Sequence, residues 1–173
     1  MHKIRLLMPL LIAVLVSAGT VAADNTRNFV AHLSSSEELP PPGVVNDSLA
    51  QGEAIFNLSQ DGTELHYKLI VANIDNVVAA HIHLGPVGVN GPVVAFLAGP
   101  FAPAGGRTDG VLAEGTITAA NLVGPLAGHP FSDLIKAMEA GNTYVNVHTN
   151  DGVDGFNTGP GDFPGGEIRG QIH

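Results

Sequence analysis

The chain has 173 residues and no cysteine, and its 16 acidic residues outnumber the seven basic ones to give a formal net charge of −9. The lack of cysteine excludes disulfide bonds, thiolate metal sites and cysteine nucleophiles. A chain this acidic is not expected to bind nucleic acid or an anionic membrane surface by charge.

Residues 1–23 have the pattern of a secretory signal peptide. Lys3 and Arg5 precede an apolar stretch, Leu6–Val16, and small residues end at Val21-Ala22-Ala23. The stretch is short for a transmembrane helix, although an uncleaved anchor is the alternative. We therefore expect an exported protein, periplasmic or secreted, with no other membrane attachment. Cleavage after the signal peptide would leave a single domain of 150 residues with a net charge of −11.

Alternating polar and apolar residues predict β-structure in the first half of the chain. Three segments alternate in this way: Asn28–Leu33, Gln51–Ser59 and Thr63–Val71. A period of two is typical of a strand that buries one face. Asp61-Gly62 predicts a tight hairpin turn between the second and third segments. Residues 34–48 are rich in proline, which lacks a backbone donor, and are expected to form a loop.

The second half predicts more short strands and one helix. Strands are expected at Val77–Leu84, Pro92–Leu97, Val111–Thr118, Thr143–Thr149 and Gly166–His173. Residues 99–110 are expected to form a loop. Ser132 could cap a short helix, Asp133–Ala140, which Gly141 would end. About eight short strands and one short helix indicate an all-β fold, an antiparallel sandwich or barrel.

Two histidines stand close together on one predicted strand. Side chains alternate along a strand, so His81 and His83 project from one face while Ala80 and Ile82 project from the other. Two neighbouring imidazoles on a rigid surface can chelate a metal ion. They could instead be hydrogen-bonded residues that tie a loop to the sheet.

Five short motifs follow one another through the chain. They are Glu37-Glu38-Leu39-Pro40, Ala80-His81-Ile82-His83, Asn90-Gly91-Pro92-Val93-Val94, Tyr144-Val145-Asn146-Val147-His148-Thr149 and Gly166-Glu167-Ile168-Arg169-Gly170-Gln171. Together, and in this order, they resemble the CHRD domain, a family named for chordin. The resemblance spans roughly Asn28 to His173 and implies a domain at 24–173 of the single-domain exported bacterial and archaeal type. It implies an immunoglobulin-like β-sandwich or barrel and says little about activity. Residues 150–165 depart from the family, which has a short turn there.

The strands that carry these motifs are expected to pair, which would bring His148 to the His81/His83 strand. Three neutral imidazoles suit copper or zinc, and the lack of sulfur ligands argues against a Cu(I) thiolate site. Four further residues could supply a fourth ligand or orient an imidazole: His173, Asn146, Glu167 and Arg169. As the last residue, His173 is also expected to be a frayed end.

These patterns favour an exported domain that binds a transition metal, copper before zinc, for metal sequestration, delivery or redox chemistry. The alternative is a non-catalytic structural or interaction module of the cell exterior, with an extracellular protein partner and structural histidines. An enzyme is the least supported interpretation, because the sequence has no recognisable catalytic nucleophile paired with a general base. The Asn150–Asp162 loop offers oxygen ligands for calcium but lacks helix–loop–helix spacing, so we expect a solvated acidic loop there.

Overall fold

The computed structural model describes residues 27–153 and 158–173. The predicted signal peptide, residues 1–23, therefore lies outside the described residues, as does part of the loop after His148. Among the described residues, no helix is long and apolar enough to cross a membrane.

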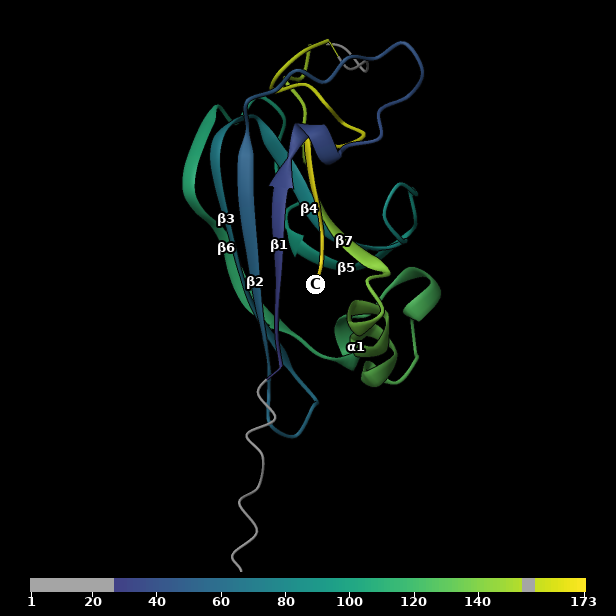
Figure 1. Cartoon of the computed structure of the whole chain (residues 1–173). Helices are drawn as coiled ribbons and strands as arrows, with labels where there is room; N and C mark the ends of the chain where they lie inside the picture. Colours follow the sequence, from purple (N-terminus) through teal and green to yellow (C-terminus); the bar gives the residue numbers. More distant parts are fainter. Residues whose placement is uncertain (1–26, 154–157) are drawn as a thin grey trace, which may run out of the picture.

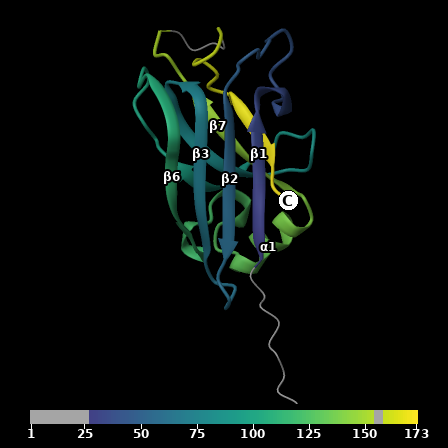
Figure 2. The same cartoon turned by 60° about the vertical axis from the view of Figure 1, so that its left-hand side comes forward.

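In the described part of the chain, eight antiparallel strands form one sheet that curls into a nearly closed, barrel-like shape (Figures 1 and 2). The strands are β1 (Asn28–Ser34), β2 (Gln51–Leu58), β3 (Leu65–Asp75), β4 (Val77–Leu84), β5 (Val93–Ala98), β6 (Arg107–Ile117), β7 (Thr143–Thr149) and β8 (Ile168–Gln171). Their order across the sheet is β5-β4-β7-β8-β1-β2-β3-β6. The predicted antiparallel all-β fold is confirmed.

Three short 3-10 helices and one α-helix connect the strands. The 3-10 helices are η1 (Ser35–Glu37), η2 (Ala119–Asn121) and η3 (Gly124–Leu126), and the α-helix is α1 (Phe131–Glu139). The helix begins two residues before the predicted start, and Pro130 rather than Ser132 occupies its N-cap. The earlier start buries Phe131 on the same helix face as Leu134. Gly141, with φ of +66°, follows the helix end as predicted.

The largest differences from the sequence prediction are at the end of β3, the start of β6 and one turn. β3 runs beyond Val71 through an irregular stretch where Asn73 has φ of +60°. The extended β3 pairs with Arg107, so β6 begins inside the predicted loop 99–110. Residues 59–64 separate β2 from β3, so the turn is wider than a two-residue hairpin. Within it, Asp61 Oδ1 accepts hydrogen bonds from Ser59 Oγ and Thr63 Oγ1.

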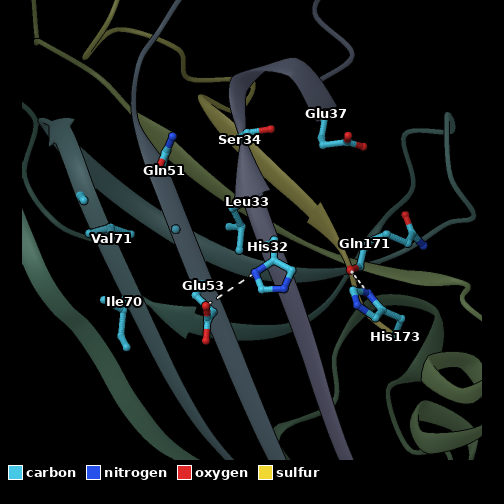
Figure 3. Close-up of a pocket in the computed structure, with 12 residues that line it drawn as sticks. His32, Leu33, Ser34, Glu37, Gln51, Glu53, Ile70, Val71, Gln171 and His173 are labelled. Atoms are coloured by element: carbon cyan, nitrogen blue, oxygen red, sulfur yellow. Dashed lines mark hydrogen bonds and ion pairs between the residues drawn. The ribbon is translucent and has the colours of Figure 1, made fainter.

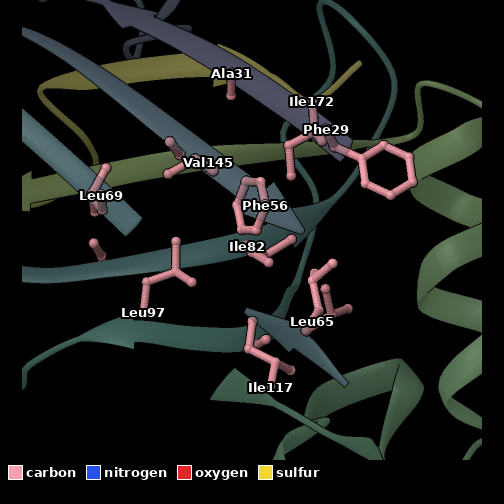
Figure 4. Packing of buried hydrophobic residues seen from close by; sticks show 14 of the residues in the cluster. Phe29, Ala31, Phe56, Leu65, Leu69, Ile82, Leu97, Ile117, Val145 and Ile172 are labelled. Atoms are coloured by element: carbon pink, nitrogen blue, oxygen red, sulfur yellow. The ribbon is translucent and has the colours of Figure 1, made fainter. Parts of the chain in front are cut away.

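Apolar side chains from most strands fill the interior (Figure 4). β4 contributes Ile82 and β7 contributes Val145, and both side chains are fully buried. Tyr67 of β3 lies on the same face as the buried Leu65 and Leu69, and it donates a hydrogen bond to the Leu97 carbonyl of β5 at 2.7 Å. Because one face of β4 and β7 packs in this core, the other face is left for the polar residues of the predicted site.

Candidate metal centre

The register of β4 and β7 brings the predicted histidines to one face of the sheet. His81 lies opposite Asn146, and His83 lies opposite Tyr144. His148 comes two residues after Asn146 and therefore projects from the same face. The three histidines form one group, the histidine cluster (His81, His83 and His148).

The imidazoles of the cluster are close enough to share one ion. Each ring offers one nitrogen, and the three nitrogens lie within 4.8 Å of one another. The ring centroids of His81 and His148 are 4.9 Å apart, and those of His83 lie 5.6 Å from His81 and 5.9 Å from His148. Zinc lies about 2.0–2.1 Å from an imidazole nitrogen in proteins, so one ion fits among these rings after small side-chain movements.

The cluster also has the hydrogen-bonding pattern of a metal site. Within residues 27–153 and 158–173, three buried nitrogens have no partner: Nδ1 of His81 and Nε2 of His83 and His148. Nδ1 of His83 donates to the Gly91 carbonyl at 2.8 Å, and Nδ1 of His148 donates to the Pro164 carbonyl at 3.0 Å. Carbonyl oxygens only accept, so these bonds place the proton on Nδ1 and leave a lone pair on Nε2. Metal-binding histidines are commonly oriented in this way.

The cluster is neutral at neutral pH. Burial, together with the neighbouring His148 and His83, lowers the pKa of His81 to about 4. Burial also lowers the pKa of His148 to about 4, although its hydrogen bond to Pro164 opposes the shift. The pKa of His83 is lowered by burial against the effect of its bond to Gly91. Neutral imidazole is the form that binds metal ions, so the cluster is ready for one without losing a proton.

Aromatic and cationic neighbours hold two of the rings in place. His83 stacks on Tyr144 with centroids 4.9 Å apart and planes at 15°, and the Arg169 guanidinium lies 3.5 Å from the Tyr144 centroid. Gly91 N–H donates to Tyr144 Oη at 3.0 Å. The ring of His81 meets Phe96 edge-on at 4.8 Å. These contacts preset the ring positions, which lowers the cost of ordering them around an ion.

Arg169 and Glu167 hold loops in the structure. Nη1 of Arg169 donates to Asn90 Oδ1 at 3.0 Å, and Nη2 donates to the Val89 carbonyl at 3.0 Å. The Glu167 carboxylate accepts bonds from Ser48 Oγ, Thr149 Oγ1 and Gly161 N. Both side chains thus fasten the segments around the cluster, and both oxygens of Glu167 are already bonded.

The structure places His173 outside the cluster. Its ring centroid lies 6.1 Å from that of His32, beside an open cavity of about 650 Å³ (Figure 3). The backbone of His173 exchanges two hydrogen bonds with Val30 at 2.9 and 3.0 Å. The expectation of a frayed end is therefore wrong, because β1 holds the last residue even though its side chain is exposed.

Two buried polar side chains lie next to the cluster. Asn146, opposite His81, was a predicted site residue, and its Oδ1 is buried with no partner in the described residues. Glu38 was not predicted, yet its carboxyl is buried and lies with the Asn146 amide against Gly166. The sequence did contain a signal for Glu38, because this residue belongs to the first of the five motifs. Its burial depends on contacts with residues more than 100 positions away, which local patterns do not encode.

Comparison with known proteins agrees with the motif pattern. The model of the CHRD domain matches residues 29–172, which is nearly the whole described chain. Searches of curated proteins and of solved structures found no significant match. Because the family match covers far more than half of the sequence, the chain belongs to the CHRD domain family.

Proposed function

We propose that the protein binds one transition-metal ion at the histidine cluster and acts outside the cytoplasm in metal sequestration, delivery or redox chemistry. Two observations on the same three imidazoles carry this proposal: each offers a nitrogen within 4.8 Å of the others, and each has one buried nitrogen with no hydrogen-bond partner in the described chain. A buried polar atom without a partner costs about 1–3 kcal/mol. A shared metal ion would satisfy all three nitrogens at once.

Copper is the metal we propose. The donor set is entirely imidazole nitrogen, which suits copper and zinc, and Cu²⁺ binds most tightly among the divalent first-row ions. Structural zinc sites normally have four protein ligands, whereas three histidines make up this cluster. An open fourth position would let copper change oxidation state or pass to a partner. Export is part of the same proposal and rests on the signal-peptide pattern of residues 1–23.

The competing function is a structural or interaction module. The bonds from His83 to Gly91 and from His148 to Pro164 favour it, because each ties a loop to the sheet. These bonds use only Nδ1 of each ring, however, and explain neither Nε2 nor the position of His81.

Metal titration separates the two functions. Calorimetry with Cu(II) and Zn(II) would be carried out on the purified protein, on His81→Ala/His83→Ala, and on the control His66→Ala/His129→Ala, which removes two exposed histidines outside the cluster. We expect equimolar binding by the wild type and the control, and none by the cluster variant. A free metal concentration 100 times the Kd should stabilise the fold by about 2.7 kcal/mol, seen as a raised Tm. Absence of binding in a folded wild type, or equal binding by the cluster variant, would refute the proposal.

A further inference from the structure

Two further histidines stand side by side on the outer face of the sheet. The backbones of Val30 and His173 exchange two hydrogen bonds, which continues the antiparallel pairing of β1 with β8. In this register His32 lies opposite Gln171, and His173, two residues farther along, projects from the same face. The ring centroids of His32 and His173 lie 6.1 Å apart, beside the open cavity of about 650 Å³ (Figure 3).

Each of these two rings has an acceptor beside its Nδ1 atom. Nδ1 of His173 donates a hydrogen bond to the Gln171 carbonyl at 3.3 Å. Glu53 lies opposite His32 on β2, and its carboxylate oxygen is 3.6 Å from Nδ1 of His32. A carbonyl or carboxylate acceptor favours the tautomer with its proton on Nδ1, which leaves the lone pair on Nε2. Metal-binding histidines are oriented by carbonyl and carboxylate groups in the same way.

The spacing of the two rings suits one shared ion. In the histidine cluster the ring centroids are 4.9 to 5.9 Å apart, only slightly less than the 6.1 Å between His32 and His173. Both side chains are exposed, that of His32 to 69 %, so both rings have room to rotate. Small rotations would bring Nε2 of each ring to about 2.0–2.1 Å from an ion, the distance found for zinc. Water from the cavity would fill the remaining coordination positions.

This pair is separate from the histidine cluster, although both lie on the outer face of the sheet. One row of side chains crosses β4, β7, β8 and β1: His83, Tyr144, Gln171 and His32. Three strand spacings of about 4.7–4.9 Å each separate His83 from His32 along the sheet, which is too far for one ion to bridge. Between them, the amide nitrogen of Gln171 donates to two backbone carbonyls and ties the row to neighbouring loops.

We infer that His32 and His173 form a second metal site, which binds a divalent transition-metal ion such as Zn²⁺ or Cu²⁺ through Nε2 of each ring. Glu53 is a positioning residue for this site, because it acts through His32 rather than on the ion. Two imidazoles bind an ion more weakly than three, so the second site fills only at metal concentrations above those that saturate the histidine cluster. The inference does not depend on the proposed function, because none of these residues belongs to the cluster.

The second site is tested by titrating the protein with Zn(II) beyond the first equivalent, at constant neutral pH, while NMR follows the histidine rings. The ring signals of His32 and His173 should shift together, with one shared dissociation constant. His66 and His129 are matched controls, because each is exposed and lies beside a carboxylate, at 3.9 and 3.3 Å. Their signals should not shift over the same range of zinc concentration. Different constants for His32 and His173, or equal shifts of the controls, would refute the second site.

Substitutions separate the two ligands from the positioning residue. His32→Ala should abolish the shift of His173 at the zinc concentrations that fill the site in the wild type. Glu53→Ala should weaken zinc binding by the pair about tenfold. It should also move the nitrogen chemical shifts of the metal-free His32 ring away from the Nδ1–H tautomer. The control Glu64→Ala, beside His66, should change neither quantity. An unchanged His173 shift in His32→Ala would refute the shared site, and unchanged affinity and nitrogen shifts in Glu53→Ala would refute the positioning role.

The same titration keeps the second site distinct from the proposed function. His81→Ala/His83→Ala should retain the joint shift of His32 and His173, because its substitutions lie outside the second site. If the wild type bound no ion at the histidine cluster while His32 and His173 still shifted together, the proposed function would fall and the second site would stand. Binding at the cluster without any joint shift would have the opposite meaning.

Discussion

Glu167 shows how a single buried charge can organise the loops near the metal centre. Its side chain is 1 % exposed, and its carboxylate accepts bonds from Ser48 Oγ at 2.5 Å, Thr149 Oγ1 at 2.6 Å and Gly161 N at 3.0 Å. These donors belong to the segment before β2, the end of β7 and the loop before β8. A buried charge is tolerated only when hydrogen bonds replace its lost water, and here three do so.

Glu167→Gln should destabilise the fold by about 1–3 kcal/mol, because one acceptor oxygen becomes an NH₂ group that faces a donor. Urea unfolding measures the change. The control is Glu114→Gln, which removes an exposed ion pair with Lys68 and should cost less than about 0.5 kcal/mol. Equal effects of the two substitutions would mean that the Glu167 network contributes nothing beyond a surface pair.

At the scale of elements, α1 is held by its amphipathic pattern and by a glycine stop. Its buried residues, Phe131, Leu134, Ile135 and Met138, recur at helical spacing and join the main core. The exposed face carries an ion pair between Asp133 and Lys136. No side chain of α1 belongs to the histidine cluster, so the helix affects the site only through stability.

Leu134→Ala should cost about 2–5 kcal/mol, because it opens a cavity around a fully buried side chain. The matched control, Lys136→Ala, removes a side chain that is 71 % exposed and should change stability by less than about 0.5 kcal/mol. Urea unfolding compares the two, with copper titration of the folded variants alongside. A small effect of Leu134→Ala would show that the helix is not packed as described.

At the scale of the whole molecule, the buried histidines make stability depend on pH. The folded pKa values of His81 and His148 are near 4, below the ordinary value of 6.5, and that of His83 is also lowered. Between pH 4 and 6.5 the unfolded chain binds more protons than the folded protein. The stability that the neutral histidines contribute is therefore fully present above pH 6.5 and falls as the pH drops toward 4. Glu38 acts in the opposite direction between pH 4.5 and 7, because its folded pKa is raised.

We expect the free energy of unfolding of the metal-free protein to decrease from pH 6.5 to 4, since three histidines outweigh one carboxyl. Urea unfolding at a series of pH values measures the slope. His148→Ala should flatten it, whereas His129→Ala, which alters an exposed ring, should not. If His148→Ala left the slope of the free energy of unfolding against pH unchanged, this would contradict the conclusion that the histidines are buried and neutral.

Metal affinity should follow the folded pKa values rather than the ordinary value for histidine. The ligands are already neutral well below pH 6.5, so the copper Kd should stay nearly constant between pH 7 and about 5 and should weaken as the pH approaches 4. Calorimetry across this range gives the profile. A loss of affinity centred at 6.5 would indicate exposed ligands with ordinary pKa values.

The sequence by itself determined the strands and the faces of their side chains. Backbone geometry makes side chains alternate along any strand, so the pairing of His81 and His83 on one face could be predicted without knowing the fold. The helix stop at Gly141 could also be predicted from the local sequence, because the left-handed backbone conformation after the helix favours glycine. The strand boundaries, in contrast, depend on long-range interactions. β6 begins at Arg107 because the extended β3 offers a partner strand there.

Only the tertiary structure decided which residues meet. The strand order β4-β7-β8 places His148 beside His81, and the pairing of β8 with β1 carries His173 away to His32. The contact of Glu38 with Asn146 above Gly166 joins three segments that are far apart in sequence. Such contacts depend on the packing of the whole sheet, which local side-chain periodicity does not specify.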